Sequence, residues 1–169
     1  MVVNDSPGHH VGWLNAACGA GGWSGIRLSP MRGRELEVLV KTAARQALVN
    51  VSEQLARAVA ESGVRTGIAC ASVPHTTCAL LINEDEEGLR EDILRLSGEV
   101  IEPLRRKAPF AHDRIDNNAA AHLTSLFFHP SVTVPISGGK PLLGTWQSLF
   151  LLELDGPRTR TVRFTITGE

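Results

Sequence analysis

Hydrophobic and polar residues alternate along three stretches of the chain, and this alternation predicts strands. Leu36, Val38 and Val40 alternate with polar neighbours, and residues 132–136 and 162–166 follow the same pattern. A period of two places the hydrophobic side chains of each stretch on one face. Residues 45–49 are expected to pair with the strand around residues 36–40. Pro135 predicts that its strand lies at a sheet edge or bulge.

Three further stretches are more continuously apolar, and they also predict strands: residues 65–73, 77–82 and 147–154. The last is expected to be a central strand. Between these stretches, hydrophobic residues recur at spacings of three and four, which is typical of helices. The helices are expected from Asn50 to Gly63, from Leu89 to Pro103, and from Asn117 or Asn118 to Phe127.

The predicted elements do not alternate strictly between strand and helix. Their order is one strand, one helix, two strands, two helices and three strands. This order favours an α+β fold: one compact domain with a mostly antiparallel sheet and three helices. The domain is expected to span residues 31–169. Residues 1–30, which are rich in glycine, are expected to form a flexible extension, and Met31 is a candidate native start.

Charge and cysteine content narrow the class of protein. Seventeen basic and 18 acidic residues give a net charge of −1, which does not favour nucleic acid or an anionic membrane as a partner. No run of about 18 apolar residues is present, and the start lacks a signal-peptide pattern. Three cysteines without a CxxC spacing predict neither a disulfide framework nor a thiolate zinc site. A cytoplasmic location is expected.

Histidines are the residues with the clearest potential for chemistry. His75 follows a proline in a break between two strands, whereas His112 lies beside Asp113 in a polar loop, ten residues before His122. Three imidazoles with an open fourth position are one catalytic zinc arrangement. Asp113 and Glu84 could orient such ligands or act as a general base. Each histidine could instead be separately hydrogen-bonded, and His129 is expected to face water at a helix end.

Two other segments could bind a substrate. Asn83 and Glu84 end the strand that begins just after His75, while the next three acidic residues suit a helix N-terminus. The segments Gly138-Gly139-Lys140 and Gly144-Thr145-Trp146-Gln147 could cradle an anion with backbone amides, with Lys140 as the countercharge. A hairpin turn followed by a core tryptophan explains these last two segments equally well.

Several motifs, in order, resemble one protein family. The segment His75-Thr76-Thr77-Cys78-Ala79-Leu80-Leu81-Ile82-Asn83-Glu84 is similar to its HTS-x-(S/A)-L-x-(L/I)-NE motif, and the pair His112 and His122 matches its spaced histidines. The segments 131–136 and 144–149 resemble its C-terminal signature. The chain is thus similar to YjbQ-like proteins, also called secondary thiamine-phosphate synthases, over roughly residues 34–169. Thr77 stands where the family often has serine.

The resemblance implies a homotrimer with sites near subunit boundaries. It implies that His75, His112 and His122 bind a divalent metal, zinc, with magnesium an option for a diphosphate substrate. The implied activity joins a pyrimidine diphosphate to a thiazole phosphate and releases pyrophosphate. The substrate would be a phosphorylated small molecule. Roles for the remaining candidates are expected as follows: Glu84, Asp113 and Gln147 in catalysis, and Asn83, Lys140, Gly144, Thr145, Trp146 and Arg160 in substrate or phosphate binding.

Two alternatives remain open at this point. The first is a metal-dependent phosphate-ester or anhydride hydrolase whose synthase activity is incidental. The second is a non-catalytic trimer that binds a metabolite. Turnover without the thiazole acceptor would favour the first, and binding without turnover would favour the second.

Overall fold

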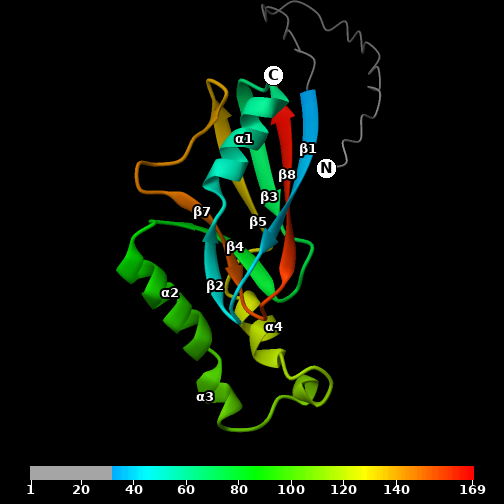
Figure 1. Ribbon diagram of the computed structural model, residues 1–169, viewed down its shortest axis with the longest axis vertical. Helices are drawn as coiled ribbons and strands as arrows, with labels where there is room; N and C mark the ends of the chain where they lie inside the picture. The colour runs from blue at the N-terminus through cyan, green and yellow to red at the C-terminus, as the bar shows by residue number, and fades with distance from the viewer. Residues whose placement is uncertain (1–31) are drawn as a thin grey trace, which may run out of the picture.

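The computed structural model describes residues 32–169, which form two antiparallel sheets with helices at their edges and faces (Figure 1). The predicted extension over residues 1–30, and Met31, lie outside the described residues. Within residues 32–169, no helix is long and apolar enough to cross a membrane.

The larger sheet has five strands in the order β1-β8-β3-β5-β6. Their bounds are β1 Arg32–Lys41, β3 Thr66–Ser72, β5 Ser131–Ser137, β6 Lys140–Pro141 and β8 Thr159–Gly168. In β8, Val162, Phe164 and Ile166 are fully buried, as the alternation predicts. The edge position predicted for Pro135 is wrong, because its strand β5 lies between β3 and β6. The short strand β6 pairs with Ile136 and Ser137 and not with Pro135, so the missing N–H of Pro135 removes no bond from that ladder.

The smaller sheet has three strands in the order β2-β7-β4, with bounds β2 Ala47–Asn50, β4 Cys78–Asn83 and β7 Ser148–Glu153. The prediction that residues 45–49 pair with the first strand is wrong, because β2 pairs with β7 and β1 pairs with β8. Alternation shows which face of a strand is buried but carries no information about its partner.

Both faces of the smaller sheet are covered, which explains the continuous apolar run of β7. Leu149 and Leu151 belong to the core shared with the larger sheet and with α1 (Ser52–Ser62). Phe150 and Leu152 face a second cluster, with residues of α2 (Glu87–Glu99) and α4 (Ala119–Ser125). The central position predicted for this strand is confirmed.

The helices follow the prediction with two additions. α1 ends at Gly63, whose positive φ of 70° suits a residue without a Cβ. α2 ends before Pro103, which instead lies in the first turn of the short helix α3 (Glu102–Arg105). The predicted polar loop over residues 107–117 contains the 3₁₀ helix η1 (Ala111–Arg114). The α+β class with antiparallel pairing and three main helices is confirmed.

Candidate functional site

A buried ion pair closes one end of the smaller sheet. The guanidinium of Arg160 donates to the carboxylate of Glu153 through Nε at 2.8 Å, and the side chains are 6% and 0% exposed. Burial alone would raise the pKa of Glu153, but hydrogen bonds and the charge of Arg160 hold that pKa below its usual value. Cys78 pairs with Glu153 across the strands, and burial raises the pKa of its thiol to about 11. This end of the sheet is therefore buried and carries a paired charge.

His75 lies against the same ion pair. The backbone N–H of Thr161 donates to Nε2 of His75 at 2.9 Å. Burial, then the positive charge of Arg160, lower the pKa of His75, and Glu153 partly opposes them. A neutral imidazole that accepts at Nε2 carries its proton on Nδ1. The strand β8 thus fixes both the orientation and the tautomer of this ring.

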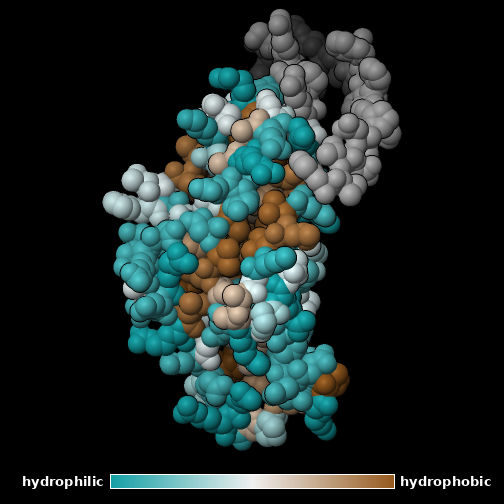
Figure 2. Space-filling model, in the orientation of Figure 1, coloured by the Kyte–Doolittle hydropathy of each residue, from teal (hydrophilic) through white to brown (hydrophobic). Residues whose placement is uncertain are grey.

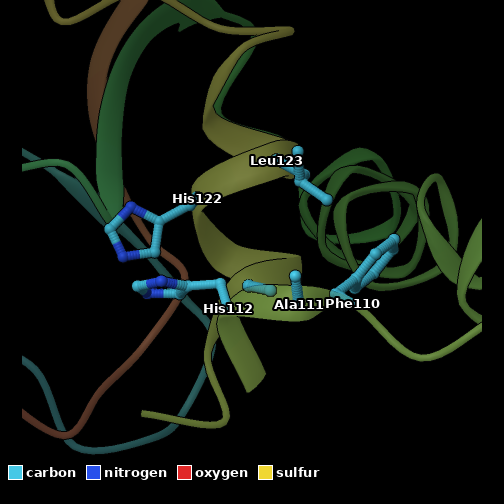
Figure 3. Close-up of a pocket in the computed structure, with 6 residues that line it drawn as sticks. Phe110, Ala111, His112, His122 and Leu123 are labelled. Atoms are coloured by element: carbon cyan, nitrogen blue, oxygen red, sulfur yellow. The ribbon is translucent and has the colours of Figure 1, made fainter. Parts of the chain in front are cut away.

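His112 on η1 and His122 on α4 are in direct contact. Their ring centroids are 4.9 Å apart with an interplanar angle of 82°. Figure 3 shows the two imidazoles on one side of α4, with Phe110 and Leu123 on the other. Nε2 of His112 is buried and has no hydrogen-bond partner within residues 32–169. A buried imidazole nitrogen without a hydrogen-bond partner destabilises the fold, so this atom is a candidate for binding a ligand.

The two histidines line an apolar pocket of about 430 Å³ between η1 and α4. Its remaining walls are Phe110, Ala111, Ala119 and Leu123. These walls, the two imidazole rings included, expose almost only carbon atoms to the pocket, and Nε2 of His112 has almost no surface open to it.

One hydrogen bond joins the two elements of this pocket, and two more attach it to the rest of the site. The N–H of Ala119 donates to Oδ1 of Asp113 at 3.0 Å and joins η1 to α4. Oγ of Ser125 donates at 3.1 Å to the carbonyl of Thr76, the residue after His75. Nδ2 of Asn118 donates at 3.1 Å to Asp155, two residues after Glu153. All three histidines therefore lie at the end of the sheet where the ion pair is.

The structure brings His112 and His122 together but does not gather a complete ligand set. In the part of the chain that is described, no three His, Cys, Asp or Glu side chains are grouped as they are around a metal ion. His75 lies near this pair, because the next residue, Thr76, accepts from Ser125 on α4. Its Nε2, however, accepts the N–H of Thr161. That all three bind one ion stays a prediction.

Asp113 and Arg160 lie with the histidines, whereas Asn83, Glu84 and the Gly144–Gln147 turn lie at the opposite end of the smaller sheet. Asn83 pairs with Ser148, while Cys78 pairs with Glu153, so the two ends are five residue steps apart. At 3.3–3.4 Å a step this separation is about 17 Å. Glu84 follows Asn83, the Gly144–Gln147 turn precedes Ser148, and Lys140 is on β6. Within one copy of the chain, these residues and the histidines do not share a small ligand.

Comparisons with known proteins identify the family. The model of the family described as "UPF0047 protein YjbQ-like" matches residues 36–169. This chain belongs to the YjbQ-like family. A UPF0047 protein of Archaeoglobus fulgidus is 46% identical over 127 residues, which cover 75% of this chain and 96% of the relative. The UPF0047 protein YugU of Bacillus subtilis is 32% identical over 133 residues, which cover 76% and 96%.

Solved YjbQ-like structures share the fold. A YbjQ-like protein of unknown function from Sulfolobus solfataricus is 40% identical, with a TM-score of 0.78 over 82% of this chain and 99% of that chain. A hypothetical protein from Aeropyrum pernix is 36% identical, with a TM-score of 0.75 over 80% and 99%. The predicted family and fold are confirmed, and these relatives assign no activity.

In this YjbQ-like chain, Arg160 is mostly occupied by structural partners. Nε and Nη2 of Arg160 bind Glu153, and Nη2 also donates to the hydroxyl of Thr77. Within residues 32–169, only its Nη1 has no hydrogen-bond partner. A role in phosphate binding therefore rests on this one nitrogen.

The sequence reasoning missed Glu153 as a site residue. It accepts from Arg160, from the hydroxyl of Thr42 and from two backbone N–H groups. The signal was present, because Glu153 is the single charged residue in the apolar run over residues 149–154. A carboxylate in such a run needs a buried partner, and the partner Arg160 is on β8, the next strand along the chain, which belongs to the larger sheet.

Proposed function

We propose that this protein is an enzyme that uses a divalent metal ion, zinc, to act on a phosphorylated small molecule. The observation that carries the proposal is the buried, unpaired Nε2 of His112 in contact with His122. His75 would be the third ligand.

The residues present fit a metal ion of this kind. Neutral imidazole is a common ligand for zinc, and His112 and His122 are in direct contact, with Nε2 of His112 buried and without a partner within residues 32–169. His75 is held neutral by burial and by Arg160, but its Nε2 accepts the N–H of Thr161 and its Nδ1 carries the proton, so the ring would have to give up that bond to coordinate a metal. A bound divalent ion would polarise a phosphate oxygen or lower the pKa of a bound water.

The chain's own residues would do the remaining work. Asp113 orients the histidine pair through its bond to Ala119. Nη1 of Arg160 lies near His75 and could donate a hydrogen bond to a phosphate oxygen. The family resemblance supports a thiamine-phosphate synthase reaction, in which a pyrimidine diphosphate and a thiazole phosphate are joined and pyrophosphate leaves. A diphosphate leaving group suits a site that combines a metal ion with one guanidinium.

Metal analysis tests the ligand set. We expect stoichiometric zinc in the wild type and its loss in His112→Ala and His122→Ala, with weaker binding in His75→Ala. His129→Ala is the matched control, because His129 is exposed and lies outside the pocket. Circular dichroism of each variant would show that the fold is retained. Equal zinc content in all four variants would contradict the site.

An activity assay tests the reaction. Pyrophosphate release from the pyrimidine diphosphate is measured with and without the thiazole phosphate. Release that requires the acceptor supports the synthase, and release without it supports a hydrolase. Binding of both substrates by the metal-loaded protein without any turnover would refute the enzyme.

A further inference from the structure

Two buried side-chain atoms at the junction of η1 and α4 have no hydrogen-bond partner within residues 32–169. They are Nε2 of His112 and Oδ1 of Asn118, and Asn118 is only 8% exposed. A third such atom, Oε1 of Gln54, lies on α1, elsewhere in the fold. Because a buried polar atom without a partner destabilises the fold, two of them at one junction point to a bound group that both can contact.

The amide of Asn118 is held in one orientation by Asp155. Its Nδ2 donates at 3.1 Å to Oδ2 of Asp155, and the same carboxylate oxygen accepts from Nη2 of Arg158 at 2.6 Å. An ionised carboxylate only accepts hydrogen bonds, so the nitrogen of the amide must face Asp155. Oδ1 of Asn118 therefore faces the other way, where it accepts no hydrogen bond from residues 32–169.

Asn118 does not use Oδ1 for the role that its position favours. It occupies the cap position just before α4, where an asparagine oxygen ordinarily accepts a backbone N–H of the first turn. Its side chain makes no such bond, and the N–H of Ala119 is donated to Asp113 instead. The oxygen of Asn118 is therefore buried and available to a ligand.

The backbone places Asn118 next to both histidines. Its carbonyl accepts the N–H of His122 at 3.3 Å, so these two residues are one helical turn apart. The bond from Ala119 to Asp113 joins the residue after Asn118 to the residue after His112. Figure 3 shows both imidazoles on one side of α4. All three side chains thus belong to one short part of the fold.

We propose that Oδ1 of Asn118 is a ligand of the bound metal ion, together with His112 and His122. It would take the place that His75 can take only by giving up its bond to the N–H of Thr161. The inference rests on the proposed function, because it concerns the same ion. That function needs a third ligand but does not require it to be His75.

The bond from Asn118 to Asp155 suits a metal ligand. Carboxylates that accept a hydrogen bond from ligating histidines fix the orientation of the ring and raise its basicity. Asp155 would do the same for the amide, because the bond donated by Nδ2 draws electron density toward Oδ1. The amide would therefore be oriented before the ion binds.

A set of two imidazole nitrogens and one amide oxygen has two chemical consequences. All three ligands are neutral, so the ion keeps its full charge for polarising a phosphate oxygen. The set also needs only two residues of the His, Cys, Asp and Glu kind, and no larger group of these is found within residues 32–169. On the face in Figure 2, the end of the molecule that carries α3 and α4 is mainly hydrophilic, so a hydrated ion would approach over polar surface.

Zinc affinity tests the ligand. The full-length wild type and Asn118→Leu are compared by competition with a chromophoric chelator, after circular dichroism has shown that each is folded. We expect Asn118→Leu to bind zinc more than about 100-fold more weakly, because losing an outer partner of a ligand alone costs about 10–100-fold. Asn117→Gly is the matched control, because Asn117 is exposed and glycine readily adopts its positive φ of 47°. Its affinity should equal that of the wild type.

Two outcomes of this comparison have different meanings. Unchanged affinity in Asn118→Leu, with zinc lost in His112→Ala, would overturn the inference and leave the proposed function intact. A wild type that binds no zinc would refute both.

Asp155→Ala separates a ligand from a structural bond. This variant removes the partner of Nδ2 but keeps the amide oxygen of Asn118. We expect it to weaken zinc binding by no more than about 100-fold, and by less than Asn118→Leu. Equal losses in the two variants would show that Asn118 acts only through its bond to Asp155, and would overturn the inference.

X-ray absorption spectra of the zinc-loaded wild type count the imidazole ligands directly. We expect two imidazoles and an oxygen ligand. Three imidazoles would assign the third place to His75, which would overturn the inference without touching the proposed function.

Discussion

The two ends of the β4–β7 pair differ in almost every physical respect. At one end, Cys78 and Glu153 are buried and the carboxylate is neutralised by Arg160. At the other end, Asn83 is exposed and the strand leads from a turn that presents Trp146 to solvent. One end is a buried interior with fixed charges, whereas the other end is exposed to solvent. The comparison teaches that candidate residues close in the sequence need not serve one site in one copy.

The largest effect on stability is expected from removing the charge of Arg160 at the buried end of the β4–β7 pair. Arg160→Met leaves the carboxylate of Glu153 buried without its partner, and breaking a buried pair costs about 3–5 kcal/mol. Urea unfolding followed by circular dichroism would measure this loss in the free energy of unfolding. The double variant Glu153→Met/Arg160→Met should recover most of it, because no unpaired charge remains.

Arg163→Met is the matched control on the same strand. Arg163 pairs with Glu37 across β1 and β8, but these side chains are 41% and 54% exposed. An exposed pair contributes at most about 1 kcal/mol. Equal losses of stability for Arg160→Met and Arg163→Met would show that burial does not strengthen the pair of Arg160 with Glu153.

A second large effect on stability is expected when the pH is lowered. The pKa of Glu153 is lower in the folded chain than in the unfolded chain, so the unfolded chain binds the proton first as the pH falls. The stability that Glu153 contributes is complete above about pH 4.3, the ordinary glutamate pKa, and is lost as the pH falls through its lowered folded value. Urea unfolding between pH 7 and pH 3 measures this. The double variant should lose less stability over the same range.

A smaller effect is expected where η1 meets α4. Asp113→Ala removes the acceptor of the Ala119 N–H, and loss of a helix-capping bond costs about 1 kcal/mol. The imidazole resonances of His112 and His122 should shift in NMR spectra, because the bond joins their two elements. Asp116→Ala, at an exposed neighbouring position, should change neither the stability nor these resonances.

The smallest effect on stability is expected at the exposed end of the β4–β7 pair. Trp146→Ala should change the free energy of unfolding of one copy by less than about 0.5 kcal/mol, because the side chain is mostly exposed. Urea unfolding of the variant beside the wild type measures this difference. A large loss of stability would mean that the indole packs within its own copy.

The sequence predicted the elements better than their partners. The alternation of Val162, Phe164 and Ile166 is enough to identify a two-faced strand, and the apolar run over residues 147–154 is enough to identify a central one. The pairing of β1 with β8 joins the two ends of the described chain. No local pattern contains that information, because pairing depends on the whole core.

The candidate site was predicted in the same uneven way. His112 and His122 come together because one short connection links η1 to α4. Glu84 was grouped with His75 because they are close in the sequence, but an extended strand lies between them and separates them. The sequence already placed these two residues at opposite ends of one predicted strand, which is enough to predict their separation.

The bond between Asp113 and Ala119 has a consequence for kinetics. Because it ties η1 to α4, His112 and His122 would separate only when residues 111–122 open as a unit. Anything held between the two rings would then leave at the rate of this opening, whatever the concentration of competing chelator in solution. A ligand of modest affinity could in this way have a long residence time.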